Sequence, residues 1–195
     1  MSTSTATCMK NAGYTTMIAR GWHSSGTIDT GACTSLNAAK AAGIPNRDVY
    51  FFPCPTCSAS ASSQLNSMVN YLKANCSGSW NGMIWLDIEG SQYWTGNTTS
   101  NRTWYQSLVN ACGALSGARC GVYASASQWS AIFGSTSYVY GQATTPQLWY
   151  AHYDNKASFS DFSSFGGWSK PWAKQYIGDA TVCSFGVDVN FIPSQ

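Results

Sequence analysis

Four apolar runs typical of buried strands divide the first two thirds of the chain at regular intervals. They begin near Tyr14, Asp48, Gly82 and Arg119, so successive runs start 34, 34 and 37 residues apart. Intervals of this length leave room for a helix between consecutive strands, as in βαβ units of a parallel sheet. The pattern therefore predicts an α/β fold in which strands and helices alternate.

Helical periodicity fills the intervals between these runs. We predict helices from Asp29 to about Ala42 with Asp29 or Thr30 as the N-cap, over 58–74, and from Thr98 or Thr99 to Leu115. After residue 133 the pattern changes to closely spaced strand-like segments, Q-L-W-Y-A-H-Y, P-W-A-K-Q-Y-I and F-G-V-D-V-N-F. A βα array that ends in such strands is typical of an irregular TIM-like barrel. We expect a single domain over residues 1–195.

In such barrels the chemistry lies at the carboxyl ends of the strands. Glu89, the only glutamate of the chain, closes the run M-I-W-L-D-I-E-G two residues after Asp87. In an extended strand these carboxyl groups share one face, with Cα atoms roughly 6.6 Å apart. Such a pair suits glycosidic bond cleavage, which needs one protonated and one charged carboxyl group.

The surroundings of Glu89 favour a protonated carboxyl group. The charge of Asp87 and the apolar neighbours Ile84, Trp85 and Ile88 should raise the pKa of Glu89. The alternative is that the pair caps a helix or meets an arginine. The position of the acids inside a run of buried type argues against that alternative.

Composition narrows the classes of partner. Only 9% of the 195 residues are charged, the formal net charge is +2 and the pI is about 8.1. This charge is far below that of a nucleic-acid-binding surface, so we expect no nucleic acid partner. No apolar run is long enough to span a membrane, so we expect no membrane partner. We also expect the protein to be a monomer.

Cysteine usage indicates an oxidising compartment. Eight cysteines allow up to four disulfides, and Asn75, Asn97 and Asn101 begin glycosylation sequons. We therefore expect a secreted protein or one delivered to a lysosome or phagosome. The chain carries no signal-peptide pattern, so we expect it to be a mature or truncated form.

The motif C-P-T-C from Cys54 to Cys57 has two interpretations. A thioredoxin-type redox motif would also lie between a strand and a helix, but the rest of the chain lacks that pattern. We therefore favour a local structural disulfide. His23 and His152 show no metal-ligand spacing, and we expect no metal and no cofactor. Alternation also places His152 on the outer face of its strand, opposite Tyr153.

The ordered motifs W-L-D-I-E-G, G-V-Y-A-S, L-W-Y-A-H-Y, W-A-K-Q-Y and V-D-V-N resemble the glycoside hydrolase family 25 (Chalaropsis-type) lysozymes. Further segments, such as S-T-S-T-A-T-C-M-K-N-A-G-Y and V-Y-F-F-P-C-P, resemble the cysteine-rich protist and nematode branch. The resemblance implies a barrel of five βα units plus three further strands. It also implies a lysozyme that hydrolyses the β-1,4 bond between N-acetylmuramic acid and N-acetylglucosamine in bacterial peptidoglycan.

Carried over by motif, Glu89 would be the general acid and Asp87 the charged neighbour that orients the substrate acetamido group. Asp188 in V-D-V-N would hold the assembly in register. The residues at or near strand ends that we expect to bind the sugar chain are Arg20, Trp22, Tyr93, Tyr123, Tyr153, Gln175 and Tyr176.

One departure from the family concerns its first strand, which carries a further aspartate in a pattern like G-x-D-V-S. Met1 falls in the loop that follows this strand, so we expect the strand and its aspartate to be absent here. A chitinase-like hydrolase is a weaker alternative, because Gly82 and Trp85 stand where that class has two of its acids. The other alternative is a catalytically impaired homologue that acts as a carbohydrate-binding protein.

Overall fold

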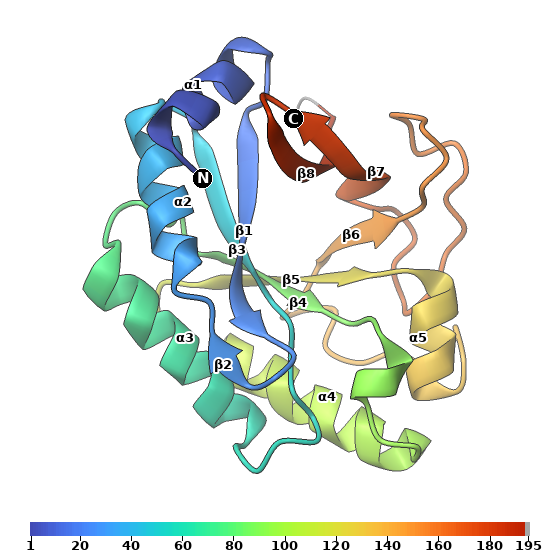
Figure 1. Ribbon diagram of the computed structural model, residues 1–195. Coiled ribbons are helices and arrows are strands. Elements are labelled where there is room, and N and C mark those ends of the chain that lie inside the picture. Colours follow the sequence, from blue (N-terminus) through green and yellow to red (C-terminus); the bar gives the residue numbers. More distant parts are fainter. Residues whose placement is uncertain (194–195) are drawn as a thin grey trace.

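Strands and helices alternate up to residue 133, and three strands close the chain. The structure, a computed structural model, describes residues 1–193 (Figure 1). Its helices are α1 (Thr3–Asn11), α2 (Gly31–Ala41), α3 (Ala61–Asn75), α4 (Thr98–Gly113), α5 (Ala126–Phe133) and the 3₁₀ helix η1 (Ser91–Tyr93). The strands are β1 (Thr16–His23), β2 (Thr27–Ile28), β3 (Asn46–Phe51), β4 (Met83–Asp87), β5 (Arg119–Ala124), β6 (Gln147–Ala151), β7 (Ala173–Val182) and β8 (Phe185–Phe191).

All eight strands form one sheet in the order β2-β1-β3-β4-β5-β6-β7-β8. The six central strands, β1 and β3 to β7, run parallel to one another. The two edge strands are antiparallel to their neighbours, β2 to β1 and β8 to β7. The predicted α/β fold and irregular TIM-like architecture are thereby confirmed. Within residues 1–193, β1 and β8 share no ladder, so the sheet is a half-barrel that stays open between them.

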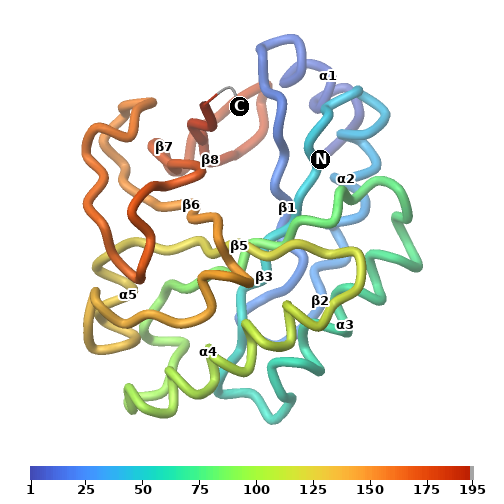
Figure 2. The backbone as a smooth tube through the Cα atoms, turned by 180° about the vertical axis from the view of Figure 1, so that it is seen from behind, coloured from blue at the N-terminus to red at the C-terminus, as the bar shows by residue number. Residues whose placement is uncertain are grey.

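The two faces of the sheet bury different residues because side chains alternate along each strand. The helices pack on the outer face and follow one another around the curve from α2 to α5 (Figures 1 and 2). The outer face of β4 contributes Ile84 and Leu86 to the core under these helices. The inner face contributes Met83 and Trp85 to a smaller cluster inside the barrel.

The predicted helices α2, α3 and α4 are confirmed, with ends that differ by a few residues from the pattern. Asp29 precedes α2, whose N-cap is Thr30, but the Asp29 carboxylate accepts a hydrogen bond from the backbone N–H of Gly31. The sequence pattern did not predict α1 or α5. Both helices are short, with nine and eight residues, so too few apolar positions repeat to reveal the period.

Four disulfides pair all eight cysteines, in agreement with the expected number. They are Cys8–Cys183, Cys33–Cys76, Cys54–Cys57 and Cys112–Cys120. Cys54 and Cys57 of C-P-T-C pair with each other, as the expected local disulfide requires. Cys8 lies on α1 and Cys183 in the turn between β7 and β8, so this disulfide ties the first helix to the last hairpin. Among residues 1–193, no helix has the length and apolar character needed to cross a membrane.

A buried acid, Asp48, lies on the inner face of β3 at the end of the barrel away from the strands' carboxyl ends. Its carboxylate accepts a hydrogen bond from Trp85 Nε1 (3.3 Å). Burial raises the pKa of Asp48 to about 6, although that hydrogen bond and the charges of Arg119 and Arg47 oppose the shift. The folded protein therefore holds a proton on Asp48 over a pH range in which the unfolded chain has lost it.

This shift predicts a pH-dependent effect of Asp48→Asn. The stability that the Asp48 proton contributes is complete below the unfolded pKa near 3.8 and is lost as the pH rises through about 6. The neutral asparagine side chain avoids this loss, so we expect the variant to be more stable than the wild type by roughly 3 kcal/mol at pH 8. At pH 3.5 the two proteins should have similar free energies of unfolding. Urea unfolding at both pH values measures this, and a difference that does not change with pH would contradict the assignment.

Candidate active site

A cavity of about 990 Å³ lies at the carboxyl ends of the parallel strands and continues along the open side of the half-barrel. Its lining includes residues of both edge regions, among them Ile18 of β1 and Asn190 of β8. Three carboxyl groups proposed from the sequence meet in it, those of Asp87, Glu89 and Asp188. The barrel topology thus brings the end of β4 and the last strand to one space.

Asp87 and Glu89 face the same cavity, as alternation predicts. β4 ends at Asp87, and Glu89 stands two residues beyond the strand instead of within it. The segment stays in register because the backbone N–H of Ile88 donates to the carbonyl of Tyr123 on β5 (2.8 Å). Ile88 is fully buried on the outer side, so the two acids are held on the inner side.

The two acids differ in burial, and burial decides where a shared proton resides. Asp87 is only 3% exposed, and its Oδ1 atom has no hydrogen-bond partner among the described residues. Burial and then the charge of Glu89 raise the pKa of Asp87 well above its usual value. The carboxyl group of Glu89 is half-buried, and its pKa is raised by burial and then by the charge of Asp188. Burial therefore disfavours the ionised form more strongly at Asp87 than at Glu89.

This result refines the sequence-based expectation for Glu89. Burial raises its pKa as expected, and the charge of Asp188 on β8 adds to the effect of burial. Asp87, deeper in the barrel, is the less readily ionised of the two. The charges of Asp87, Glu89 and Asp188 therefore influence one another's ionisation.

Asp188 is held by a network of polar groups across the cavity from β4. Gln175 Nε2 donates to Asp188 Oδ2 (3.2 Å), and the backbone N–H of Asp179 donates to Asp188 Oδ1 (2.9 Å). Gln175 Oε1 in turn accepts hydrogen bonds from the hydroxyl groups of Tyr123 (2.6 Å) and Tyr153 (2.7 Å). The network joins β5, β7, β8 and the segment after β6.

Most of the residues expected to bind substrate line this cavity, namely Arg20, Tyr123, Tyr153, Gln175 and Tyr176. Arg20 Nε also pairs with Asp29 Oδ2 (2.8 Å), which lines the cavity as well. Tyr93 is exposed and lies outside the lining, with its ring edge-on to Phe52 at a centroid distance of 5.3 Å. Phe52 does line the cavity, so Tyr93 stands beside its rim.

The structure contradicts the expectation for Trp22. This side chain is buried in the outer core, stacks on Phe51 and donates from Nε1 to Gln64 (3.2 Å). Strict alternation from Arg20 would point Trp22 inward, but the pairing of β1 with β3 shifts register between these two residues. Gly21 permits the irregularity, since a Cβ there would collide with the Met68 sulfur.

Sequence reasoning missed other residues of the cavity, notably Tyr50, Trp149 and Asn190. Tyr50 lies on β3 two residues after Asp48, so alternation within D-V-Y-F-F was the signal for an inward side chain. Burial raises the pKa of Tyr50 to about 12 against the opposing charge of Arg20, so its hydroxyl group stays neutral. Trp149 Nε1 donates to Asn190 Oδ1 (2.8 Å), a contact between distant segments that no local pattern reveals.

Comparison with known proteins gives consistent matches. A family model described as lysozyme-like protein 1 matches residues 1–176. A Dictyostelium discoideum protein named probable GH family 25 lysozyme 2 is 48% identical over 187 residues, which cover 96% of this chain and 84% of that protein. Lysozyme-like protein 5 of Caenorhabditis elegans is 39% identical over 196 residues, 99% of this chain and 87% of that protein.

The fold comparison agrees with these matches. The structure of a muramidase from Trichobolus zukalii superposes with a TM-score of 0.73 and 23% sequence identity, covering 100% of this chain and 92% of that one. At this identity the superposition supports the fold, and the more similar sequences support the family. The chain belongs to the glycoside hydrolase family 25 lysozymes and is a glycoside hydrolase.

Proposed function

We propose that this protein is an N-acetylmuramidase that hydrolyses the β-1,4 bond between N-acetylmuramic acid and N-acetylglucosamine in bacterial peptidoglycan. The observation that carries the proposal is the pair Asp87 and Glu89 in one cavity at the carboxyl end of β4. The two acids differ in burial, which is the arrangement that gives two carboxyl groups separate roles.

Glu89 is the general acid in this proposal. Its carboxyl group is half-buried and makes no hydrogen bond to the described residues, so it is free to approach the glycosidic oxygen. Its raised pKa favours the protonated form that a general acid needs. The charge of Asp188 supports that protonated state from the opposite strand.

Asp87 is the partner that receives the substrate acetamido group. Its buried Oδ1 atom lacks a hydrogen-bond donor among the described residues, and an amide N–H of the sugar supplies one. A hydrogen bond from that N–H stabilises the ionised form of Asp87 and lowers its pKa. The proton shared by the pair then moves to Glu89, where it is needed. Substrate binding thus charges one acid and protonates the other.

The remaining cavity residues suit a polar sugar chain. The hydroxyl groups of Tyr50, Tyr123 and Tyr153 and the amide of Gln175 offer hydrogen bonds, while tyrosine rings offer flat apolar faces. Arg20 stands at the same opening and is suited to an acidic substituent of the wall polymer. In our proposal these residues and Tyr176 bind the glycan strand.

The disulfides and the poorly charged surface support an oxidising location, and we propose secretion or delivery to a lysosome or phagosome. In either place the enzyme would act on bacteria for digestion or defence. The raised pKa of Glu89 favours the protonated general acid that the proposal requires, which suits an acidic environment.

Turnover distinguishes this proposal from a carbohydrate-binding protein that does not cleave its ligand. Purified bacterial peptidoglycan is incubated with the protein, and the reducing ends released per protein molecule are counted over time. We expect release to continue through many turnovers at acidic pH. Saturable binding to the walls without release of reducing ends would refute the enzyme proposal and support the binding protein.

A further inference from the structure

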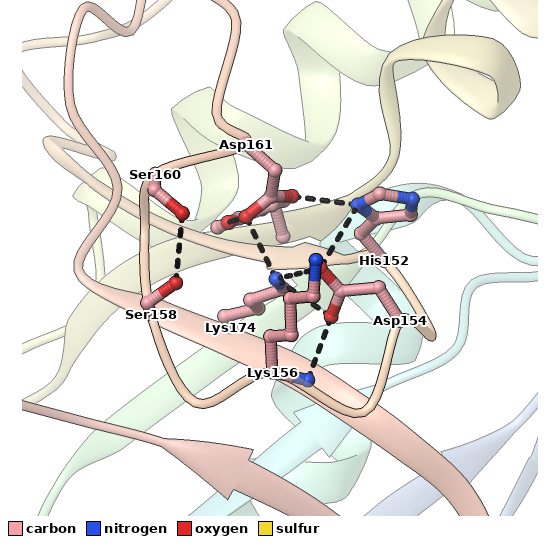
Figure 3. A network of polar contacts seen from close by, with 8 residues as sticks. His152, Asp154, Lys156, Ser158, Ser160, Asp161 and Lys174 are labelled. Carbon is pink, nitrogen blue, oxygen red and sulfur yellow. Dashed lines mark hydrogen bonds and ion pairs between the residues drawn. The ribbon is translucent and has the colours of Figure 1, made fainter.

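The side chain of Lys174 on β7 is fully buried although it is charged. Figure 3 shows its polar partners. Its Nζ atom donates hydrogen bonds to Asp161 Oδ1 (2.7 Å) and to Asp154 Oδ2 (2.9 Å). Both carboxylates belong to the segment 152–162, which follows β6 and lies on the outer side of β7. A buried ammonium group is costly unless it is paired, and these two partners satisfy it.

Further hydrogen bonds hold the same segment around Lys174. Asp161 also accepts a hydrogen bond from the Tyr150 hydroxyl group (2.9 Å), and its second oxygen lies 2.6 Å from His152 Nδ1. Asp154 Oδ1 accepts from the backbone N–H of Lys156 (2.9 Å). The carboxylates of Asp154 and Asp161 therefore each contact another residue of the segment 152–162 and also Lys174 of the sheet (Figure 3).

The charge state of this cluster follows from its geometry. Burial alone would lower the pKa of Lys174, but the hydrogen bonds to Asp161 and Asp154 outweigh it and raise that pKa. Burial alone would raise the pKa of Asp161. The side-chain hydrogen bonds from Lys174, His152 and Tyr150 outweigh burial and hold that pKa below its usual range. Ligand atoms of His152, Asp154 and Asp161 lie within 4.8 Å of one another, as a metal site would require. Lys174 already supplies the positive charge there.

The same segment carries Tyr153, whose side chain points the other way, into the active-site cavity. The Tyr153 hydroxyl group donates a hydrogen bond to Oε1 of Gln175, which is the residue after Lys174 in the chain. Gln175 in turn donates a hydrogen bond from Nε2 to Asp188. Tyr153 is 58% exposed, so packing alone fixes it weakly. The backbone contributes two bonds to β7, from His152 N–H to the Gln175 carbonyl (3.0 Å) and from Asn155 N–H to the Tyr176 carbonyl (3.1 Å).

We propose that Lys174 is a positioning residue that clamps the segment 152–162 to β7 and thereby sets Tyr153, Gln175 and Asp188 on the cavity wall opposite Glu89. This inference rests on the proposed muramidase function for its catalytic readout. The clamp itself is a property of the fold. The hydrogen bonds of Lys174 go to Asp154 and Asp161, neither of which lines the cavity, so the proposal assigns its effect to the placement of Tyr153.

The catalytic test is a double-mutant cycle on purified peptidoglycan. Lys174→Met should lower kcat/KM about tenfold, because loss of the clamp misplaces Tyr153. Lys156→Met, which removes an exposed lysine from the same loop, is the matched control and should change kcat/KM by less than about twofold. In a Tyr153→Phe background, Lys174→Met should have little further effect. An undiminished effect in that background would overturn the proposal, since a purely structural role does not depend on the Tyr153 hydroxyl group.

A second test does not depend on catalysis. The exchange of the His152 and Asn155 backbone N–H groups with solvent should be at least about tenfold faster in Lys174→Met than in wild type and Lys156→Met. If Lys174→Met does not fold, Asp154→Asn weakens the same clamp while preserving shape and should show the same direction. Unchanged exchange in the clamp variants would refute the clamp. Absence of wild-type turnover would instead refute only the proposed function, because the exchange test remains valid.

Discussion

The Glu89→Gln variant is expected to retain its fold and to lose peptidoglycan hydrolysis, with a turnover number about a thousandfold or more below that of the wild type. Glutamine preserves the shape of the side chain but has no proton to donate to the leaving oxygen. The site has no equivalent replacement, because Asp87 is more deeply buried and Asp188 lies on the opposite wall. Steady-state release of reducing ends measures the loss, and circular dichroism verifies the fold.

Two further variants make this result specific. Asp87→Asn should also lower turnover, by about a hundredfold, because the neutral amide cannot take the charge that passes the proton to Glu89. Asp179→Asn removes an exposed carboxylate from the β7–β8 hairpin and should leave turnover within about twofold. Residual activity of Glu89→Gln near that of Asp179→Asn would mean that Glu89 is not the acid.

Removal of the Cys8–Cys183 disulfide is expected to cause the largest loss of stability from any single cross-link. The bond joins residues 175 positions apart and ties α1 to the hairpin of β7 and β8. By the chain-entropy argument, opening so long a loop in the unfolded chain costs on the order of 4–5 kcal/mol. The double substitution Cys8→Ser and Cys183→Ser should lower the urea midpoint accordingly. Within residues 1–193 no strand pairing joins β1 to β8, so this disulfide is a covalent link between the N-terminal helix and the last hairpin that the sheet does not provide.

The Cys54–Cys57 disulfide provides the matched comparison. It links residues only three positions apart, so it restricts the unfolded chain far less. Replacement of both cysteines by serine should cost less than half of the loss caused by opening Cys8–Cys183. Equal losses from the two pairs would contradict the proposed role of Cys8–Cys183 in holding the ends of the half-barrel together.

Local alternation was sufficient to predict which face of the sheet several candidate side chains occupy. It placed Asp87 and Glu89 on one face and His152 opposite Tyr153, and the structure has these side chains where the pattern predicts. These predictions succeed because each depends only on the two-residue period of a strand. The motif order then placed Asp188 on the last strand, where it lines the same cavity.

The failures arise where geometry departs from that period or depends on distant contacts. Trp22 follows an irregularity at Gly21, which no single side chain reveals, and therefore packs outward. Asp154, Asp161 and Lys174 are separated along the chain, and only the path of the loop brings their charges together. The pKa argument for Glu89 identified burial but could not identify Asp188 as a further charged neighbour, because only the barrel topology brings β8 to the end of β4.

The identity of the new reducing end tests the central claim most directly. Peptidoglycan digested by the wild-type protein is reduced with borohydride and hydrolysed, and the amino sugar alcohol is identified by chromatography and mass spectrometry. Cleavage after N-acetylmuramic acid by the Asp87 and Glu89 pair predicts muramitol, with none formed by Glu89→Gln. Glucosaminitol as the product, or muramitol formed equally by the Glu89→Gln variant, would contradict the account.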